Sequence, residues 1–441
     1  MSIKMIRKSI LVFCSWLLLN SLAHAVLTIE ITQGSEGAQP IAIVPFEWVG
    51  KSVRPASIKK IIAADLQRSG QFAPLLDKDL ISQPHDGTKV NYQTWRALNV
   101  GYLVVGKIHA VADGSFQVQF QLLDVFNGRQ LAGYSIRSLN SGLRRTAHHI
   151  SDIIYKTVTG EEGAFNTHIS YITVSKNKKN IKRYQLAIAD ADGYNEKIIY
   201  TSPQPLMSPT WSPDGTRLAY VSFLSGRPEI VVQNIFSAKR ESLASFKGLN
   251  NAPRWSPDGK FLALTLSKDG NPEIYIMNIN SRKLTRITRN YSIDTEPAWL
   301  PNNKGLIFTS DRGGSPQLYE IQFSQNRPIS RAKRLTFEGN YNSRSAVSSD
   351  GRYIAMVNRT QGKFRIAVLE RETKLFNVLT KGSLDESPSF APNGRMIIYA
   401  TEQKYRGILS VVSVDGRARQ RLSFKNGDVR EPVWSPYTIN K

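Results

Sequence analysis

The sequence predicts a multidomain protein, with a small N-terminal α/β domain followed by an all-β six-bladed propeller that the C-terminal strand closes. Three observations support this prediction. The phrase Trp-Ser-Pro-Asp-Gly recurs six times, with variations, at intervals of 43 to 48 residues. The sequence before the first copy mixes helical and strand periodicities, and the last copy stands at the end of the chain. A repeat of this length, enough for four short strands, is typical of a β-propeller.

Residues 1–25 are predicted to be a cleaved signal peptide. They contain a positively charged start, an apolar stretch at 10–19 too short to span a bilayer comfortably, and an Ala-His-Ala cleavage site. An uncleaved anchor is the competing interpretation. The only cysteine, Cys14, lies in this segment, so the mature chain from Val26 is expected to lack disulfides, thiol catalysis and cysteine metal sites. A cysteine-free chain suits an oxidising compartment such as the periplasm.

The chain is strongly basic, with a formal charge of +23. Such a surface favours an acidic protein, anionic lipid or nucleic acid as partner, and export argues against nucleic acid. No run after the signal is long and apolar enough to span a membrane, so we expect a soluble mature chain without a transmembrane segment. The densest group of cations is predicted to lie at a solvated hairpin tip and consists of Lys176, Lys178, Lys179, Lys182 and Arg183.

The mature chain is expected to begin with a strand-forming arm. Apolar residues alternate with polar ones along it, as in a half-buried strand. The arm consists of Val26, Leu27, Thr28, Ile29, Glu30, Ile31, Thr32 and Gln33. Two interpretations stay open: an edge strand of its own domain, which the sequence alone favours, or a strand added to the sheet edge of a partner.

Residues 26–162 are predicted to form the α/β domain. Alternation or a short apolar run indicates a strand, and apolar residues that recur every three or four positions indicate a helix. In chain order we expect a buried strand at 41–46, a helix at 58–66, strands at 101–111 and 116–125 joined by an Asp-Gly hairpin turn, and a helix at 143–158. Gly70 and Gly160 are expected to end the two helices. A linker at 163–168 then leads to the propeller at 169–441.

Each copy of the repeated phrase is predicted to end one strand and begin the turn to the next. The proline before the anchor residue holds the residue that precedes it extended, and Pro-Asp-Gly makes a tight turn in which glycine takes the positive φ. The anchor side chain is expected to pack between neighbouring blades. The six anchors are Trp211, Trp255, Trp299, Val347, Phe390 and Trp434.

The number of strands predicts how the ring closes. Six sets of three strands follow from Ile169 onward, and there are six anchor strands. The first set has no anchor strand before it, and the last anchor strand, at Trp434, has no set after it. Pairing these two closes a six-bladed ring and removes an open sheet edge that would invite aggregation.

Enzyme signatures are scarce in this sequence. The histidines of the mature chain all precede the repeats, so a propeller enzyme that depends on histidine has no candidate there. No Gly-x-Ser-x-Gly elbow, P-loop or dinucleotide fingerprint is present. His148 and Asp152 share one helix face and could hold a metal, and a solvated helix surface is the favoured alternative. We therefore predict no catalytic residue, no metal and no cofactor.

The two residues before each repeat proline, or before Ser345 in the fourth copy, are predicted to surround the mouth of the central channel. They enter the innermost strand of each blade and make a rim with a small or polar half and a charged half. The pairs are Met207 and Ser208, Asn251 and Ala252, Thr295 and Glu296, Ser343 and Arg344, Glu386 and Ser387, and Arg430 and Glu431. Such a non-uniform rim suits recognition of a protein surface, and solvated loop ends are the alternative.

Several stretches, most of them outside the repeated phrase, resemble the TolB family of periplasmic Tol–Pal proteins. They are Pro45-Phe46-Glu47-Trp48, Ala63-Ala64-Asp65-Leu66, Ser202-Pro203-Gln204-Pro205-Leu206-Met207-Ser208-Pro209, Asp294-Thr295-Glu296-Pro297 and Val347-Ser348-Ser349-Asp350-Gly351. They occur in one order, and the resemblance covers essentially the whole mature chain.

The resemblance implies a non-enzymatic scaffold in the periplasm. Members of the family bind the peptidoglycan-associated lipoprotein, Pal, on one propeller face and the inner-membrane protein TolA through the N-terminal arm, and they support outer-membrane integrity and constriction during cell division. On this sequence the arm 26–33 would bind TolA. The Pal-binding residues would be Met207, Leu249, Ala252, Thr295, Glu296, Arg344, Glu386, Arg430 and Glu431.

The chain departs from the family pattern at two of these positions. Leu249 stands where the family is expected to have histidine, which implies an altered contact and a partner altered to match. Val26 stands where an acidic residue is expected, which implies a shifted equilibrium of the arm.

Two rival functions stay open from the sequence. One is a secreted propeller enzyme: the peptidases share the repeated phrase but add a hydrolase domain, and the lyases use histidine-bound metal, for which the repeats have no histidine. The other is a basic adaptor that binds cell-wall or lipid anions. Its binding would collapse at high ionic strength, whereas a complex with Pal should largely survive.

Overall fold

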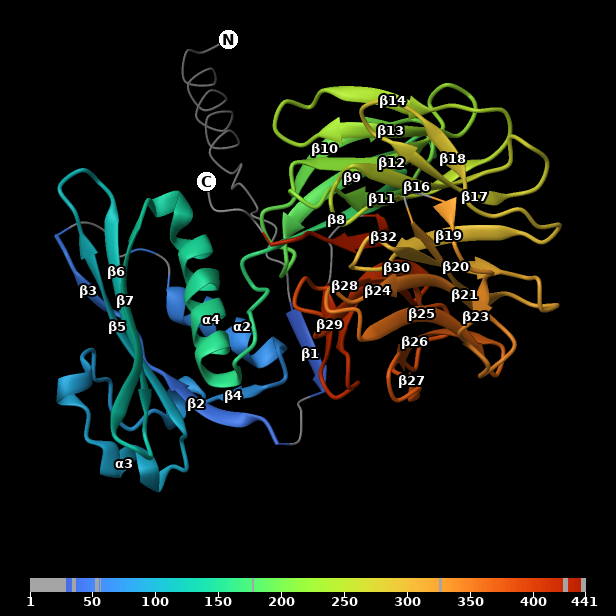
Figure 1. Ribbon diagram of the computed structural model, residues 1–441. Coiled ribbons are helices and arrows are strands. Elements are labelled where there is room, and N and C mark those ends of the chain that lie inside the picture. The colour runs from blue at the N-terminus through green and yellow to red at the C-terminus, as the bar shows by residue number, and fades with distance from the viewer. Residues whose placement is uncertain are drawn as a thin grey trace, which may run out of the picture.

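The computed structural model describes residues 37–51, 55, 57–176, 178–324, 327–422 and 427–437, and the backbone alone of 29–33. The predicted signal peptide at 1–25 and the arm residues Val26, Leu27 and Thr28 lie outside the described residues. Figure 1 shows an α/β body beside a ring of radial sheets. Within the described ranges, no helix is long and apolar enough to cross a membrane.

The α/β domain is built on one six-stranded sheet. The strand order is β4-β2-β5-β6-β7, with β3 also paired to β5. Apolar residues of α2 and α4 pack on one face of the sheet, and α3 packs on the other through Trp95. The elements are β2 (Gln39–Ile43), β3 (Glu47–Val49), α2 (Ile58–Arg68), β4 (Phe72–Pro74), α3 (Tyr92–Ala97), β5 (Tyr102–Ala110), β6 (Phe116–Asp124), β7 (Arg129–Ser138) and α4 (Leu143–Thr159), with 3-10 turns at Asp77–Asp79, Gly87–Lys89 and Asn140–Gly142.

The two predicted helices and the hairpin of this domain are confirmed. α2 and α4 occupy the expected ranges, and Gly160 follows α4 with a φ of 78°, which glycine adopts without strain. β5 and β6 pair along their whole length, and Asp113 in the turn accepts the backbone N–H of Ser115 at 3.0 Å. The sequence did not predict β4, α3 or β7. β4 and α3 are short, and β7 is so exposed that its apolar alternation is weak.

The first three blades of the propeller are four-stranded antiparallel sheets. Blade 1 contains β32 (Asp428–Trp434), β8 (His168–Lys176), β9 (Lys182–Asp190) and β10 (Lys197–Ser202). Blade 2 contains β11 (Leu206–Trp211), β12 (Arg217–Ser222), β13 (Glu229–Asn234) and β14 (Arg240–Ala244). Blade 3 contains β15 (Asn250–Trp255), β16 (Phe261–Leu266), β17 (Glu273–Asn278) and β18 (Leu284–Arg286).

The other three blades repeat this plan with small additions. Blade 4 contains β19 (Asp294–Trp299), β20 (Gly305–Ser310) and β21 (Gln317–Ser324), with β22 (Arg327–Pro328) and β23 (Lys333–Arg334) both paired to β21. Blade 5 contains β24 (Asn342–Val347), β25 (Tyr353–Thr360), β26 (Lys363–Glu370) and β27 (Phe376–Val378). Blade 6 contains β28 (Glu386–Phe390), β29 (Met396–Gln403), β30 (Arg406–Ser413) and β31 (Arg419–Leu422).

The turn of the repeated phrase has the predicted geometry, but the prediction that the residue before the repeat proline is extended is wrong, because Ser208 before Pro209 has a φ of 51°. In its first copy, Ser212 Oγ donates to Asp214 at 2.5 Å and accepts the backbone N–H of Arg217 at 2.9 Å, and Gly215 takes a φ of 67°. The indole N–H of Trp211 lies 3.4 Å from the carbonyl oxygen of Val433 on the neighbouring blade. The anchor therefore links adjacent blades while the turn returns the chain to the next strand.

The C-terminal strand closes the ring as predicted. β32 pairs antiparallel with β8, with Asp428 opposite Val174 and Trp434 opposite Ile169. The ladder continues past the strand, because the backbone N–H of Ser435 donates to the carbonyl oxygen of His168 at 2.8 Å. Blade 1 is thus assembled from both ends of the propeller sequence.

The arm pairs with the propeller, not with its own domain. Its described part, β1 (Ile29–Gln33), lies antiparallel to β31, with Ile29 opposite Leu422, and becomes the fifth strand of blade 6 (Figure 1). The favoured interpretation of an edge strand in the α/β sheet is therefore wrong. The outer strand of a blade offers unpaired backbone groups, and the sequence pattern of the arm does not show which free edge it meets.

Candidate protein-binding face of the propeller

Every innermost strand of the propeller carries a bulge at its entrance. The register between the first and second strands of each blade shifts at this point. At each bulge, the residue immediately before the proline position of the repeat has a positive φ between 49° and 56°, which costs energy for any residue except glycine. A bulge re-aims the side chain that it carries. The six residues are Ser208, Ala252, Glu296, Arg344, Ser387 and Glu431.

Four of these six residues meet in a polar network around the Arg344 guanidinium. Its two terminal nitrogens donate to Ser387 Oγ at 2.9 Å and to Glu431 Oε2 at 2.8 Å. Its Nε lies 3.4 Å from Glu296 Oε1. The predicted rim is therefore real in this respect: side chains from separate blades converge on one arginine.

The two carboxylates of this network also hold the strained backbone. Glu296 accepts the backbone N–H of Arg344 at 2.9 Å and the hydroxyl of Thr309 at 3.1 Å. Glu431 accepts the backbone N–H of Ser208 at 3.1 Å. The side chain of Arg344 keeps about a fifth of its surface exposed. The network is therefore fixed by its bonds to the backbone and is still accessible to solvent.

A second arginine in this region was not predicted. Burial lowers the pKa of the Arg254 guanidinium, and the nearby Arg344 lowers it further. Burial would also lower the pKa of Arg344, but the carboxylates of Glu431, Glu296 and Glu386 outweigh it and raise that pKa. The sequence could have singled out Arg254, because the equivalent position in the other five repeats holds an uncharged residue.

The remaining predicted residues lie around this network with different roles. Met207 and Thr295 are half-buried at the same strand entrances, and Ala252 is buried. Leu249 lies in the preceding loop, where its backbone N–H donates to Ser267 Oγ at 2.7 Å. Arg430 does not join the network, since its exposed guanidinium lies 3.7 Å from Asp428.

Comparisons with known proteins agree with this architecture. A family model for the TolB amino-terminal domain matches residues 27–131, and one for the TolB beta propeller domain matches residues 155–438. The "Tol-Pal system protein TolB" of Thioalkalivibrio sulfidiphilus is 56% identical over 98% of both chains, and that of Nitrosococcus oceani is 54% identical over 96% of both. The chain belongs to the TolB family.

A solved structure supports the same assignment for this TolB-family chain. The crystal structure of TolB from Acinetobacter baumannii is 41% identical, has a TM-score of 0.85, and covers 93% of this chain and 100% of its own. The resemblance inferred from the sequence is therefore confirmed, and so is the fold of a small α/β domain followed by a six-bladed propeller.

The pair of His148 and Asp152, which the sequence singled out, has a different environment from both interpretations. His148 is buried where the α/β domain meets blade 1, and its Nδ1 lies 2.7 Å from Asp65 of α2. Asp152 instead accepts the backbone N–H of Phe165 at 2.8 Å. The solvated surface is therefore wrong, and the two side chains have separate partners. The propeller covers this face of α4, which the helix sequence alone could not show.

His148 belongs to the one group of potential metal ligands among the residues that the structure describes, with Asp65 and Asp192. Asp65 is paired with Arg68 at 2.8 Å, and Asp192 is paired with Arg144. Because each of these two carboxylates is already paired with an arginine, a bound metal is disfavoured, and we assign the group a structural role. Burial alone would lower the pKa of His148, but the Asp65 carboxylate outweighs it and raises that pKa.

Proposed function

We propose that this chain is a non-enzymatic periplasmic scaffold of the Tol–Pal system, which binds Pal through one propeller face and TolA through the arm 26–33. The Pal-binding face is the one that carries Glu296, Arg344 and Glu431, and we call it the channel-mouth face. Membership of the TolB family and the names of the relatives support the system. In this role the chain would support outer-membrane integrity and constriction during cell division. The Arg344-centred network is the observation that carries the choice of face.

The channel-mouth face has the properties of a protein-binding hot spot. Charged groups are held in fixed geometry by bonds to the backbone, and their outer surfaces remain open to solvent. A partner that covers them meets a preorganised pattern, so few side chains have to lose freedom on binding. Glu296 is the carboxylate of this pattern that keeps more exposure, at 26% against 13% for Glu431.

The arm gives the chain a second site with two states. In the docked state β1 completes the edge of blade 6 through its backbone. In the released state the same backbone groups are free to pair with a sheet edge of TolA. Pal alters TolA binding only if Pal prefers one of these states, and the effect is then reciprocal.

The Pal site is tested by Glu296→Ala in the mature chain. Calorimetric titration with the soluble domain of Pal should show a loss of about 1–2 kcal/mol, the size expected when a hot-spot residue is truncated. Glu372→Ala, at an exposed position on blade 5, is the matched control and should bind as the wild type does. Unchanged binding by a folded Glu296→Ala protein would remove this face from the Pal site.

The TolA site is tested by deleting residues 26–33. We expect TolA binding to be lost and Pal binding to be retained, because the propeller strands pair without β1. A normal melting transition would show that the fold survives. The coupling is measured by titrating TolA with and without saturating Pal. Equal affinities would rule out coupling, and full TolA binding by the deletion variant would refute the arm as its site.

A further inference from the structure

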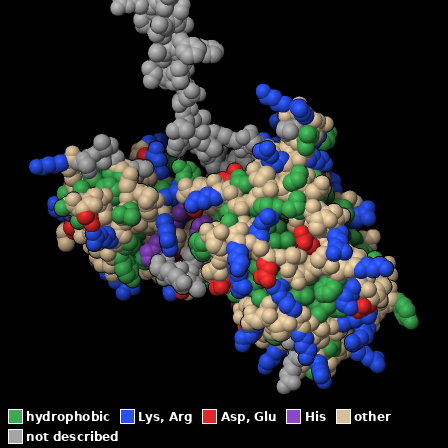
Figure 2. All heavy atoms as spheres, turned by 90° about the horizontal axis from the view of Figure 1, so that it is seen from above, with side chains coloured by type: hydrophobic (Ala, Val, Ile, Leu, Met, Phe, Trp, Pro, Cys, Tyr) green, Lys and Arg blue, Asp and Glu red, His purple; other side chains and the backbone are tan. Residues whose placement is uncertain are grey.

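A cleft separates the α/β domain from blade 1 on the side away from the channel-mouth face. It has a volume of about 900 Å³, and its lining includes Gly215 and Pro436 from the Pro-Asp-Gly type turns. These turns lie at the opposite ends of the innermost strands from the bulged residues. Figure 2 shows histidine side chains in the hollow between the two bodies, with Lys and Arg side chains beside them. The cleft is thus independent of the proposed Pal site.

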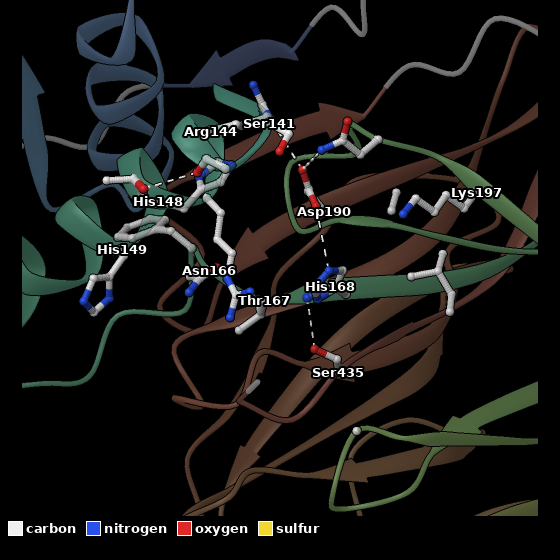
Figure 3. Close-up of a pocket in the computed structure, with 18 of the residues that line it drawn as sticks. Ser141, Arg144, His148, His149, Asn166, Thr167, His168, Asp190, Lys197 and Ser435 are labelled. Atoms are coloured by element: carbon white, nitrogen blue, oxygen red, sulfur yellow. Dashed lines mark hydrogen bonds and ion pairs between the residues drawn. The ribbon is translucent and has the colours of Figure 1, made fainter. Parts of the chain in front are cut away.

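Positive groups outnumber negative ones among the residues that line this cleft, and two of the arginines, Arg144 and Arg137, are paired with Asp192 and Asp113 outside the lining. The cations and imidazoles that line it are Arg137, Arg144, Arg145, Lys197, His148, His149 and His168. Among the described lining residues Asp190 is the one carboxylate, and it accepts a hydrogen bond from Asn195 at 2.8 Å and lies 3.4 Å from Arg144 Nε. Figure 3 shows Arg144, His148 and His149 coming from α4, and His168, Asp190 and Lys197 from the facing blade.

The first turns of α4 add to this positive field. Ser141, Gly142, Arg144 and Arg145 line the cleft, so the N-terminal end of a 17-residue helix opens into it. No side chain caps this end, and its first turn has no acidic residue, which is the usual complement of a helix N-terminus. An anion is the ligand that such a helix end accommodates.

A buried donor at the same place points independently to a ligand. The side chain of His148 is only 3% exposed, and its Nε2 has no hydrogen-bond partner. The nearest carboxylate oxygen, on Asp192, is 3.8 Å away, too far for a hydrogen bond. With Nδ1 bound to Asp65, the ring has an N–H left to donate at Nε2 when it is protonated, and the raised pKa of His148 favours that form. His148 lines the cleft, so an acceptor bound there would satisfy it.

The neighbouring imidazoles report the same excess of positive charge. Burial lowers the pKa of His149, and Arg145 lowers it further. Burial also lowers the pKa of His168, with Arg145, Lys197 and His148 acting in the same direction against Asp190. An anion in the cleft would offset this repulsion.

We propose that the cleft binds a phosphoryl group carried on an apolar body. A tetrahedral phosphoryl group presents several acceptors at once and so suits donors that approach from α4 on one wall and from blade 1 on the other. The apolar body is indicated by Leu139 and Phe236, which line the cleft and are 65% and 79% exposed. Phosphate monoesters and phospholipid headgroups share this chemistry.

The proposal is tested by calorimetric titration of the whole mature chain with phenyl phosphate, benzoate and inorganic phosphate. Phenyl phosphate should bind and should bind more tightly than either of the others. Phosphatidylcholine vesicles with and without phosphatidylglycerol form a separate arm, in which binding only to the anionic vesicles identifies a headgroup as the source. Benzoate binding as tight as that of phenyl phosphate would overturn the phosphoryl assignment.

Single substitutions locate the binding. Lys197→Gln and His149→Gln should each weaken phenyl phosphate, or the anionic vesicles, about tenfold, the usual effect of losing one charge-assisted contact. Lys182→Gln, at the distant hairpin tip between β8 and β9, is the matched control and should leave binding unchanged. Equal losses of affinity in all three variants would mean that diffuse surface charge binds the probe, which would overturn the cleft as the binding site. An absence of binding by every probe would overturn it as well.

A failure of the cleft proposal can be distinguished from a failure of the proposed function. Lys197→Gln should titrate with Pal as the wild type does, because the cleft and the channel-mouth face lie at opposite ends of the innermost strands. Melting temperatures of the three variants check that a loss of binding is not a loss of fold.

Discussion

Two networks of ion pairs in this protein have the same chemistry and different surroundings. At the channel mouth, Arg344 is shared by Glu296 and Glu431, and all three keep between 13% and 26% of their side-chain surface exposed. At the domain junction, Asp65 is shared by Arg68 and His148, and it is 1% exposed. Removing a charge at the open site leaves groups that water can reach, whereas removing one at the closed site leaves charges that water cannot reach. The open network is therefore suited to binding and the closed one to holding the domains together.

Removing the end of the last strand should produce the largest effect, because it disrupts the open network and the closure of the ring together. Deletion of 431–441 removes Glu431 from the Arg344 pairs and the end of the ladder between β32 and β8. We expect aggregation, or a much lower melting temperature, since blade 1 then has an open edge. The measurement is soluble yield with thermal unfolding, and deletion of 438–441 alone is the control. An unchanged melting curve for the longer deletion would contradict closure by this strand.

The next effect compares the two networks directly. Asp65→Ala should lower the free energy of unfolding by about 3–5 kcal/mol, because it leaves Arg68 and His148 buried without their shared carboxylate. Arg344→Ala should cost about 1–2 kcal/mol, since its partners remain partly hydrated. Urea unfolding of both variants gives the two values.

The order of the two variants should reverse when the affinity for Pal is measured. Asp65→Ala, if still folded, should bind Pal normally, whereas Arg344→Ala should bind it weakly. Equal stability losses in the two variants would show that exposure does not distinguish the networks, and the comparison would fail.

The open network could be predicted from the sequence, and the closed one could not. Glu296, Arg344 and Glu431 share one position in a repeated phrase, so counting back from the proline position is enough to align them. Repetition also determines the number of blades and the closing strand. Asp65 and His148 come from separate helices and meet Asp192 in a turn of blade 1, and no spacing connects the three.

The pairing partner of the arm is a second feature that the sequence could not predict. Its alternating pattern predicted a strand, and β1 is one. The pattern describes the two faces of the strand and not the backbone edge that it meets, so the pairing with β31 had no signal. Local periodicity therefore predicted the elements well, and contacts between separate folding units required the structure.

The closed network also predicts a modest pH dependence above neutrality. The folded-state pKa of His148 is raised above its unfolded value of about 6.5 by Asp65, with Asp192 assisting and Arg68 opposing. Its stabilising contribution is then complete below about pH 6.5 and is lost as the pH rises through the folded-state pKa, at up to about 1.4 kcal/mol per pH unit. Urea unfolding between pH 6.5 and 9 should show this decline in the wild type.

The decline should be absent from His148→Gln, which keeps a polar side chain but does not titrate. The window above pH 6.5 avoids two other groups at the junction. Asp152, whose pKa burial raises to about 6, is mostly ionised there, and His149, whose pKa is lowered, is neutral. A parallel decline in His148→Gln would assign the pH dependence to another group, and a flat wild-type profile would show that the buried imidazole is not held in its charged form.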